Sequence, residues 1–307
     1  MLLDVLDKFV DRKPELALFH RMLRGEIDKR ILRILDRGEK GKTWFIWRLF
    51  HECQERDVPV VLLDFDRDRS GLTGGFVSVV SEVCGYLGDD RTPHVCACAA
   101  RMMHRPSPAG RAPGDESPGV DWGQGNVFTG ADVHTIAGGD IWQANTVFVG
   151  SLTPVQAAQH QADMGRALCR DLAALDHAVL LIDTFERAPQ DTRAWLERWV
   201  LRALCRDLPH VLLVMAGRPE KCAPFFAQPR PWSHLVTAID ELDPFGDDDV
   251  LTYYRQCGLD MSAVGALLLA LARTSPGQMA HLGDLLQQLP GGARCPRPSA
   301  GGQERGL

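Results

Sequence analysis

Short apolar runs of strand length recur along this chain and alternate with segments of helical periodicity. Because nearly every position within a run is apolar, both faces of each predicted strand should be buried, as in a parallel sheet. The predicted strands span residues 30–35, 58–65, 178–182, 210–216 and 235–239. The predicted helices span 44–55, 154–175 and 192–208, with Thr153 as the N-cap of the second. Strands that alternate with helices predict an α/β fold, with a parallel sheet and helices on both faces.

Two neighbouring segments do not follow this pattern. Residues 105–119 are rich in Pro, Gly, Ser and Arg, and residues 120–150 combine Gly, Asn and Asp with β-forming residues. The first is predicted to be a linker, and the second a set of short strands with tight glycine turns. Residues 105–150 are therefore predicted to be an insertion between two parts of one domain, 1–104 and 151–242. The aromatic residues Phe128, Trp142 and Phe148 of the insertion either form a contact surface or pack on the domain.

The last part of the chain has a helical pattern. Predicted helices span residues 247–257, 261–274 and 278–289, which indicates a small helical subdomain over 243–290. Residues 291–307 are rich in Gly, Pro and Arg and are predicted to be disordered.

Composition narrows the classes of function. The formal net charge of −6 argues against a chain built mainly to coat nucleic acid, so a nucleic-acid partner is not favoured, although local basic patches are compatible with this charge. No apolar run approaches the length of a membrane span, and a start with Asp4, Asp7 and Lys8 among leucines is not typical of a signal peptide. The nine cysteines lack a metal-binding spacing, so we expect reduced, mostly buried thiols in a cytoplasmic protein.

The strongest chemical signal lies between the strand 30–35 and the helix that follows it. Glycines in such a loop let backbone N–H groups point at phosphate, and the helix N-terminus adds a favourable dipole. Lys42 is predicted to bridge the β- and γ-phosphates, and the Thr43 hydroxyl to bind Mg²⁺. Asp36 stands where the full pattern has a glycine, and its carboxylate is expected to repel phosphate or narrow the turn unless Gly38 supplies the missing freedom. The predicted phosphate-binding residues are Gly38, Glu39, Lys40, Gly41, Lys42 and Thr43.

Two further signals lie at the ends of predicted strands. Asp183 follows the strand 178–182 and is predicted to hold Mg²⁺ through water, together with Thr43. Glu186 comes one turn later and is predicted to polarise the attacking water. Arg218 follows the strand 210–216, and it either stabilises charge on the γ-phosphate or bonds to a neighbouring loop. The catalytic candidates are therefore Lys42, Glu186 and Arg218.

As a set, these motifs resemble those of bacterial STAND-type P-loop NTPases, which are related to the AAA+, NB-ARC and NACHT ATPases. The resemblance is carried by Phe9-Val10-Asp11-Arg12 with Glu15-Leu16, by Gly41-Lys42-Thr43, and by the stretches LLIDTFE, AGRPE and ELDPFGDDDVLTYY. It implies that the first box, with Val10 and Arg12, packs near adenine, although Asp11 replaces the usual glycine. It also implies that Pro276 contacts nucleotide, in a turn whose residue order is altered here.

The resemblance further implies a regulatory switch, closed with ADP and open, often oligomeric, with ATP, and with Mg²⁺ as the second cofactor. The expected partners are ATP and other proteins, bound through the insertion or by self-assembly. Three functions stay open: a switch with slow ATP hydrolysis, a nucleotide-binding scaffold without hydrolysis, and an AAA+ protein that acts on DNA. The third would need a basic winged helix after the helical part, whereas residues 278–289 are nearly uncharged.

Overall fold

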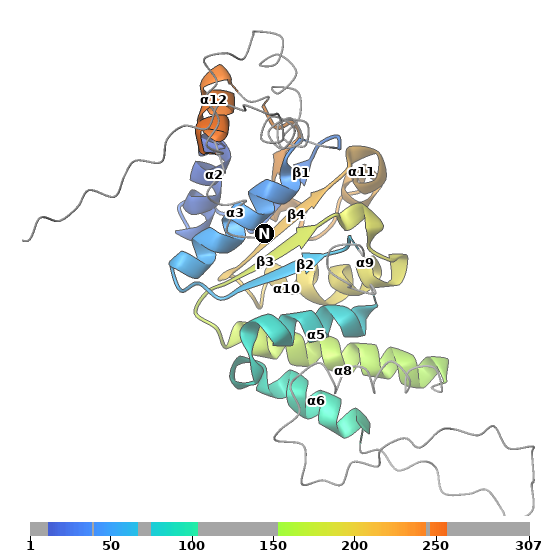
Figure 1. Ribbon diagram of the computed structural model, residues 1–307. Coiled ribbons are helices and arrows are strands. Elements are labelled where there is room, and N and C mark those ends of the chain that lie inside the picture. The colour runs from blue at the N-terminus through green and yellow to red at the C-terminus, as the bar shows by residue number, and fades with distance from the viewer. Residues whose placement is uncertain (1–11, 39, 67–74, 104–152, 244–245, 257–307) are drawn as a thin grey trace, which may run out of the picture.

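The computed structural model describes residues 12–38, 40–66, 75–103, 153–243 and 246–256 (Figure 1). The predictions made for Val10, Glu39 and Pro276 fall outside these residues. So do those for the insertion 105–150, the helices 261–274 and 278–289, and the tail 291–307.

The centre of the fold is a five-stranded parallel sheet with the strand order β2-β3-β4-β1-β5 (Figure 1). Because the strands are parallel, their carboxyl ends all lie along one edge of the sheet. Each strand matches a predicted apolar run to within a residue or two, so the predicted parallel α/β architecture is confirmed. The strands are β1 (Ile31–Leu35), β2 (Val60–Asp64), β3 (Ala178–Asp183), β4 (Val211–Gly217) and β5 (Val236–Ile239).

Helices bury both faces of this sheet. In β3, Leu180 and Ile182 belong to one apolar cluster, while Val179 and Leu181 belong to the cluster on the other face. The second face packs against α2 (Lys13–Leu23) and α3 (Lys42–Glu55). The first packs against α5 (Phe76–Leu87), α8 (Pro154–Ala173) and α9 (Gln190–Leu196).

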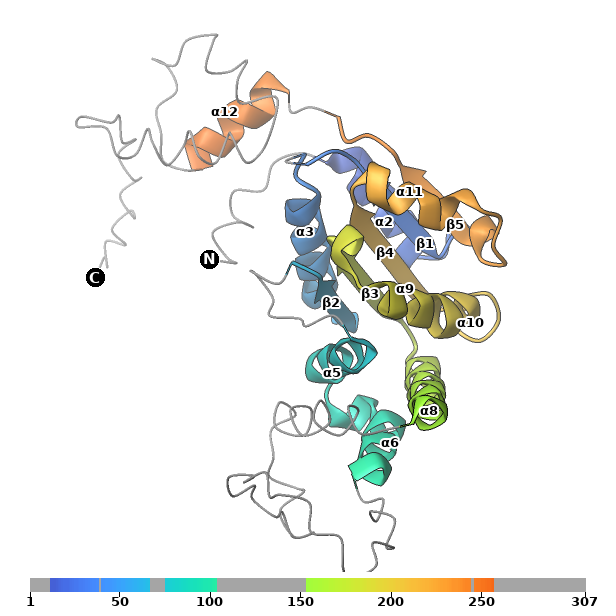
Figure 2. The same ribbon diagram turned by 90° about the vertical axis from the view of Figure 1, so that its right-hand side faces the viewer.

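The remaining helices extend this framework. In both views α6 lies against α8 on the side away from the sheet (Figures 1 and 2). The longer ones are α6 (Pro93–Met103), α11 (Pro219–Ala227) and α12 (Asp247–Gln256). The short ones are η1 (Asp89–Arg91), η2 (Phe185–Arg187), η3 (Glu197–Leu201), α10 (Arg202–Leu204) and η4 (Ser233–Leu235).

The start of α8 agrees with its sequence signal. Thr153 accepts a hydrogen bond from the backbone N–H of Gln156, and the Gln156 side chain accepts one from the backbone N–H of Thr153. This reciprocal capping box satisfies two backbone donors that the first turn leaves without a helical partner, and Pro154 is preset for that turn. The predicted cap at Thr153 is confirmed.

The predicted helix over 192–208 is present as one helical run from Gln190 to Leu204, but it is not α-helical throughout. It divides into α9, the π-helical turn η3 and α10. Within η3, Trp199 lies so close to α8 that a Cβ atom on Gly165 would come within 2.4 Å of the indole. The Cys169 thiol of α8 donates to the Trp199 carbonyl at 3.3 Å. The π-helical turn therefore occurs where this segment contacts α8, which is distant in the sequence. The periodicity of residues 192–208 carries no information about that contact.

Helices α5 and α6 had no counterpart among the predicted elements. The N-terminus of α6 is held by Asp171 of α8, whose buried carboxylate accepts from the backbone N–H groups of His94 and Val95 at 3.0 and 2.8 Å. Its first carboxylate oxygen also lies 2.7 Å from His94 Nδ1. The residue that caps α6 is therefore far away in the sequence.

Candidate functional site

The loop after β1 leads from a buried strand into the N-terminus of a helix. It leaves the sheet at Leu35 and enters α3 through Gly41, whose φ of 85° is a left-handed conformation that favours glycine. Lys42 and Thr43 are the first residues of α3, so they lie where backbone N–H groups and the helix dipole favour an anion. The predicted order of strand, glycine turn and helix N-terminus is therefore present.

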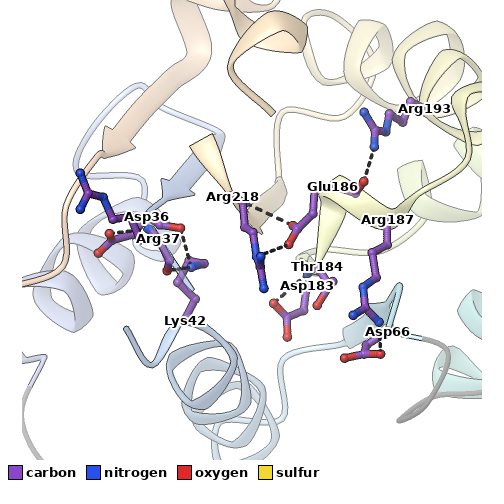
Figure 3. A network of polar contacts seen from close by, with 10 residues as sticks. All are labelled: Asp36, Arg37, Lys42, Asp66, Asp183, Thr184, Glu186, Arg187, Arg193 and Arg218. Atoms are coloured by element: carbon purple, nitrogen blue, oxygen red, sulfur yellow. Dashed lines mark hydrogen bonds and ion pairs between the residues drawn. The ribbon is translucent and has the colours of Figure 1, made fainter. Parts of the chain in front are cut away.

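Lys42 extends back along this loop. Its ammonium donates to the carbonyl oxygens of Asp36 and Arg37, at 2.6 and 2.5 Å (Figure 3). Burial lowers the pKa of Lys42, while the negative charges of Asp36, Glu186 and Asp183 act in the opposite direction. The ammonium therefore lies in a partly desolvated site where three carboxylates favour its charged form.

The Asp36 side chain has a structural role that the sequence did not reveal. It is 5% exposed, and its two oxygens accept from the backbone N–H groups of Arg37 at 2.6 Å and Leu242 at 2.8 Å. The carboxylate is thus used to tie the start of the loop to the segment that follows β5. The residue that replaces the usual glycine is therefore a link between two parts of the fold.

Arg12 makes a second link of the same kind. Its guanidinium is 3% exposed and donates to the carbonyl of Lys40 at 3.2 Å and to that of Asp243 at 2.5 Å. Arg12 itself has a φ of 72°. Through Arg12 and Asp36, both sides of the loop are bonded to residues 242–243, which precede α12. The rings of Trp44 in α3 and Tyr253 in α12 lie 5.9 Å apart between centroids.

A pair of aspartates marks the ends of β2 and β3. Asp64 and Asp183 are register partners in these strands, and both side chains are buried. Asp183 accepts from the backbone N–H of Thr184 at 2.8 Å, and Asp64 from that of Asp66 at 2.9 Å. Asp64 was missed in the sequence, although it ends an apolar strand in the same way as Asp183.

Glu186 and Arg218 form an ion pair at the same edge of the sheet. Thr184, with a φ of 53°, turns the chain into η2. The Glu186 carboxylate lies 3.4 Å from Arg218 Nε and accepts from the backbone N–H of Arg218 at 3.2 Å (Figure 3). A Cβ atom on Gly217 would lie 3.1 Å from this carboxylate, so glycine permits the close approach.

Arg218 also reaches the loop after β1. Its Nη2 would lie 3.5 Å from a Cβ atom on Gly38, which places the guanidinium between Glu186 and that loop. Figure 3 shows Lys42, Arg218 and Asp183 directed toward a common region beyond the strand ends. The structure therefore brings together Lys42, Asp183, Glu186 and Arg218, which lie far apart in the sequence.

The oxygen donors of this region suit Mg²⁺. The ion usually takes one or two carboxylates, with phosphate and water oxygens completing its shell. The candidate oxygen donors are the Thr43 hydroxyl at the start of α3 and the carboxylates of Asp183 and Asp64 at the strand ends. No cluster of three or more His, Cys, Asp or Glu side chains able to hold a metal alone occurs among the described residues.

Neither protein-family models nor curated proteins gave a match to this chain. Similar solved structures include the RuvB Holliday junction branch migration motor of Thermotoga maritima, at 14% identity and a TM-score of 0.42. The Walker-type ATPase PABY2304 of Pyrococcus abyssi has 12% identity and a TM-score of 0.46. The ORC1 protein of Aeropyrum pernix in complex with DNA has 16% identity and a TM-score of 0.42.

These alignments cover 92%, 91% and 92% of this chain, in the same order. They cover 63%, 68% and 62% of the other chains, so this chain spans less than two thirds of the RuvB and ORC1 chains. TM-scores below 0.5 do not establish a shared activity, so the functional proposal rests on the geometry of this chain. Within its described part, no helix is long and apolar enough to cross a membrane.

Proposed function

We propose that this chain is an ATP-binding P-loop NTPase that works as a nucleotide-dependent switch. The observation that carries the proposal is Lys42 at the N-terminus of α3, after a buried strand and a glycine turn, with Asp183 on the same edge of the sheet. Phosphate groups would accept hydrogen bonds from N–H groups at this helix terminus. The Lys42 ammonium would exchange the carbonyls of Asp36 and Arg37 for phosphate oxygens.

Mg²⁺ would neutralise phosphate charge and polarise the terminal phosphoryl group when it is bound with the nucleotide. The Thr43 hydroxyl would be its protein ligand on α3. Asp183, with Asp64 beside it, would hold the ion directly or through water. This assignment accounts for two adjacent buried carboxylates at the ends of β2 and β3.

In the hydrolytic form of the proposal, Glu186 orients and deprotonates the attacking water, and Arg218 stabilises charge that develops on the γ-phosphate. The ion pair between these two residues supports the alternative, a scaffold that binds nucleotide without hydrolysis, because Arg218 already occupies the carboxylate that would have to accept a hydrogen bond from the attacking water.

Phosphate release from ATP and Mg²⁺ separates the two forms. We expect slow release by the wild type and none above background by Glu186→Gln, with ATP affinity unchanged. Equal release by both proteins would remove Glu186 from the chemistry. Absence of release from a wild type that binds ATP would favour the scaffold.

The switch would act through residues 242–243. Arg12 and Asp36 connect the loop to this segment, which leads into α12. A γ-phosphate that moves the loop would therefore also change the bonds that hold the start of α12. Hydrogen exchange of the peptide that contains Leu242 should differ between ATP and ADP in the wild type, and not in Lys42→Ala. The same exchange with either nucleotide and without one would contradict the switch.

The same proposal includes adenine as the base and a cytoplasmic location. It also includes protein partners, bound through residues 105–150 or by self-assembly. They rest on the resemblance and composition described above.

A further inference from the structure

An arginine-lined groove lies on the helical layer, between α8 and the segment formed by η3 and α10. It has a volume of about 520 Å³. All of its arginines are exposed, and Asp207 is the one acidic residue among the described residues that line it. The arginines of this groove, which we call the arginine groove, are Arg166 and Arg170 of α8 together with Arg198, Arg202 and Arg206.

The arginine groove is separate from the proposed nucleotide site. Its walls are the second half of α8, which leads into the amino end of β3, and the segment 198–207, which leads into the amino end of β4. Lys42 and Asp183 lie at the carboxyl edge of the same parallel sheet. A ligand in the groove would therefore not contact the phosphate-binding loop.

Internal ion pairs do not account for most of this charge. Arg166 is paired with Asp163 at 2.6 Å. For Arg170, Arg202 and Arg206, by contrast, the described part of the chain offers no carboxylate within salt-bridge distance. Glu197, which is close to the groove in sequence, is instead paired with Arg230 at 2.9 Å. The chain is acidic overall, so this concentration of uncompensated positive charge is a local feature that net charge conceals.

Trp199 gives the groove a fixed aromatic wall. The absence of a side chain on Gly165 lets the indole pack directly on α8. The guanidinium carbons of Arg166 and Arg198 lie 5.7 and 6.0 Å from its ring centroid. Contact with the ring restricts these guanidinium groups while their N–H edges stay able to bond an anion. The π-helical turn thus places Trp199 in the wall of the groove, beside Arg166 and Arg198.

The spacing of the arginines indicates the shape of the ligand. Arg166 and Arg170 are four residues apart in α8, which corresponds to about 6 Å along the helix axis. On the facing segment, Arg198 lies in the π-helical turn, Arg202 begins α10, and Arg206 follows its end. Forked donors that extend along both walls of a groove match a linear chain of anions better than one small anion. Guanidinium groups bind phosphate through paired N–H bonds.

We propose that the arginine groove binds the phosphodiester backbone of single-stranded nucleic acid, without sequence preference. A groove of positive charge that follows the backbone, with an aromatic side chain in its wall, is the arrangement such binding requires. The inference goes beyond the proposed switch and does not depend on it. It replaces the expectation, drawn from net charge, that nucleic acid is not a partner.

The test is fluorescence anisotropy of a labelled single-stranded oligothymidylate, titrated with the full chain without ATP at several salt concentrations. Arg202→Ala/Arg206→Ala should weaken binding roughly 20-fold near 0.1 M salt, and should reduce the slope of log affinity against log salt by about 0.7 per lost contact. The matched control is Arg21→Ala/Arg24→Ala, which removes the same charge from exposed positions around the end of α2. Control affinity should stay within about twofold of the wild type.

Lys42→Ala should bind the oligonucleotide like the wild type, which makes this result independent of the nucleotide site. The proposal is overturned if the wild type does not bind the oligonucleotide at low salt. It is also overturned if the groove variant and the control lose affinity equally. A polyglutamate peptide that binds the groove when the oligonucleotide does not would show that the partner is an acidic protein instead.

Discussion

Asp36 provides a stringent test of the structure around the loop. Replacing it with glycine would restore the residue that the full phosphate-binding pattern has at this position. From pattern matching alone, Asp36→Gly should be harmless or beneficial. The structure predicts a loss of stability, because the buried carboxylate accepts hydrogen bonds from Arg37 and Leu242.

The size of the loss follows from these two bonds. The N–H of Leu242 bonds to Asp36 inside the protein, and a buried donor without its partner costs about 1–3 kcal/mol. A glycine at this position would increase the loss of stability by about 0.5–1 kcal/mol, because it raises the conformational entropy of the unfolded chain. The Arg37 N–H lies in a more exposed part of the loop, where water can replace the carboxylate. We therefore expect Asp36→Gly to lower the free energy of unfolding by about 1.5–4 kcal/mol.

Urea denaturation followed by circular dichroism measures this change, and Asp36→Asn is the matched control. Asparagine has the same shape but one acceptor oxygen instead of two, so it should retain one of the bonds and lose about half as much stability. ATP affinity of Asp36→Gly should not fall, since the carboxylate bonds to the protein and its negative charge does not favour phosphate. A glycine variant within about 0.5 kcal/mol of the wild type would refute the structural role of Asp36.

Two other substitutions test the helical layer that carries the arginine groove. Gly165→Ala would place a methyl group 2.4 Å from the Trp199 ring and should destabilise the protein by about 1–3 kcal/mol in thermal or urea unfolding. Gly85→Ala in α5, where a Cβ atom would meet nothing within 4 Å, should be neutral or stabilising, and equal effects would contradict the packing of Trp199 on α8. Asp171→Asn should cost about 2–3 kcal/mol, because a buried carboxylate that accepts from His94 and Val95 becomes an amide with one acceptor oxygen. Hydrogen exchange at the start of α6 should rise in this variant, and unchanged exchange there would show that Asp171 does not hold α6.

The sequence predicted the sheet well because its signals are local. A strand buried on both faces is an unbroken apolar run, and the turn at Gly41 and the cap at Thr153 are set by neighbouring residues. The placement of Lys42 and Asp183 on one edge then followed from parallel strand order. These features could be predicted from the sequence alone because each depends on a few consecutive residues.

The features that were missed depend on contacts between distant segments. Asp36 appeared to be a defect of the loop, since its partner Leu242 lies more than two hundred positions away in the chain. The π-helical turn at Trp199 packs against Gly165, and the start of α6 is held by Asp171, so local periodicity could not reveal either. The arginine groove was missed for a related reason. Its arginines come from α8 and from the separate segment 198–206, and an acidic total charge hid them.

The most direct test of the central claim is calorimetric titration of the full chain with ATP in the presence of Mg²⁺. Lys42→Ala is compared with Lys29→Ala, which removes the same charge before β1, at the opposite end of that strand from the loop. We predict micromolar binding, about −8 kcal/mol, by the wild type and by Lys29→Ala, and none by Lys42→Ala. Equal affinity of Lys42→Ala and wild type, or no binding by the wild type, would contradict the nucleotide site.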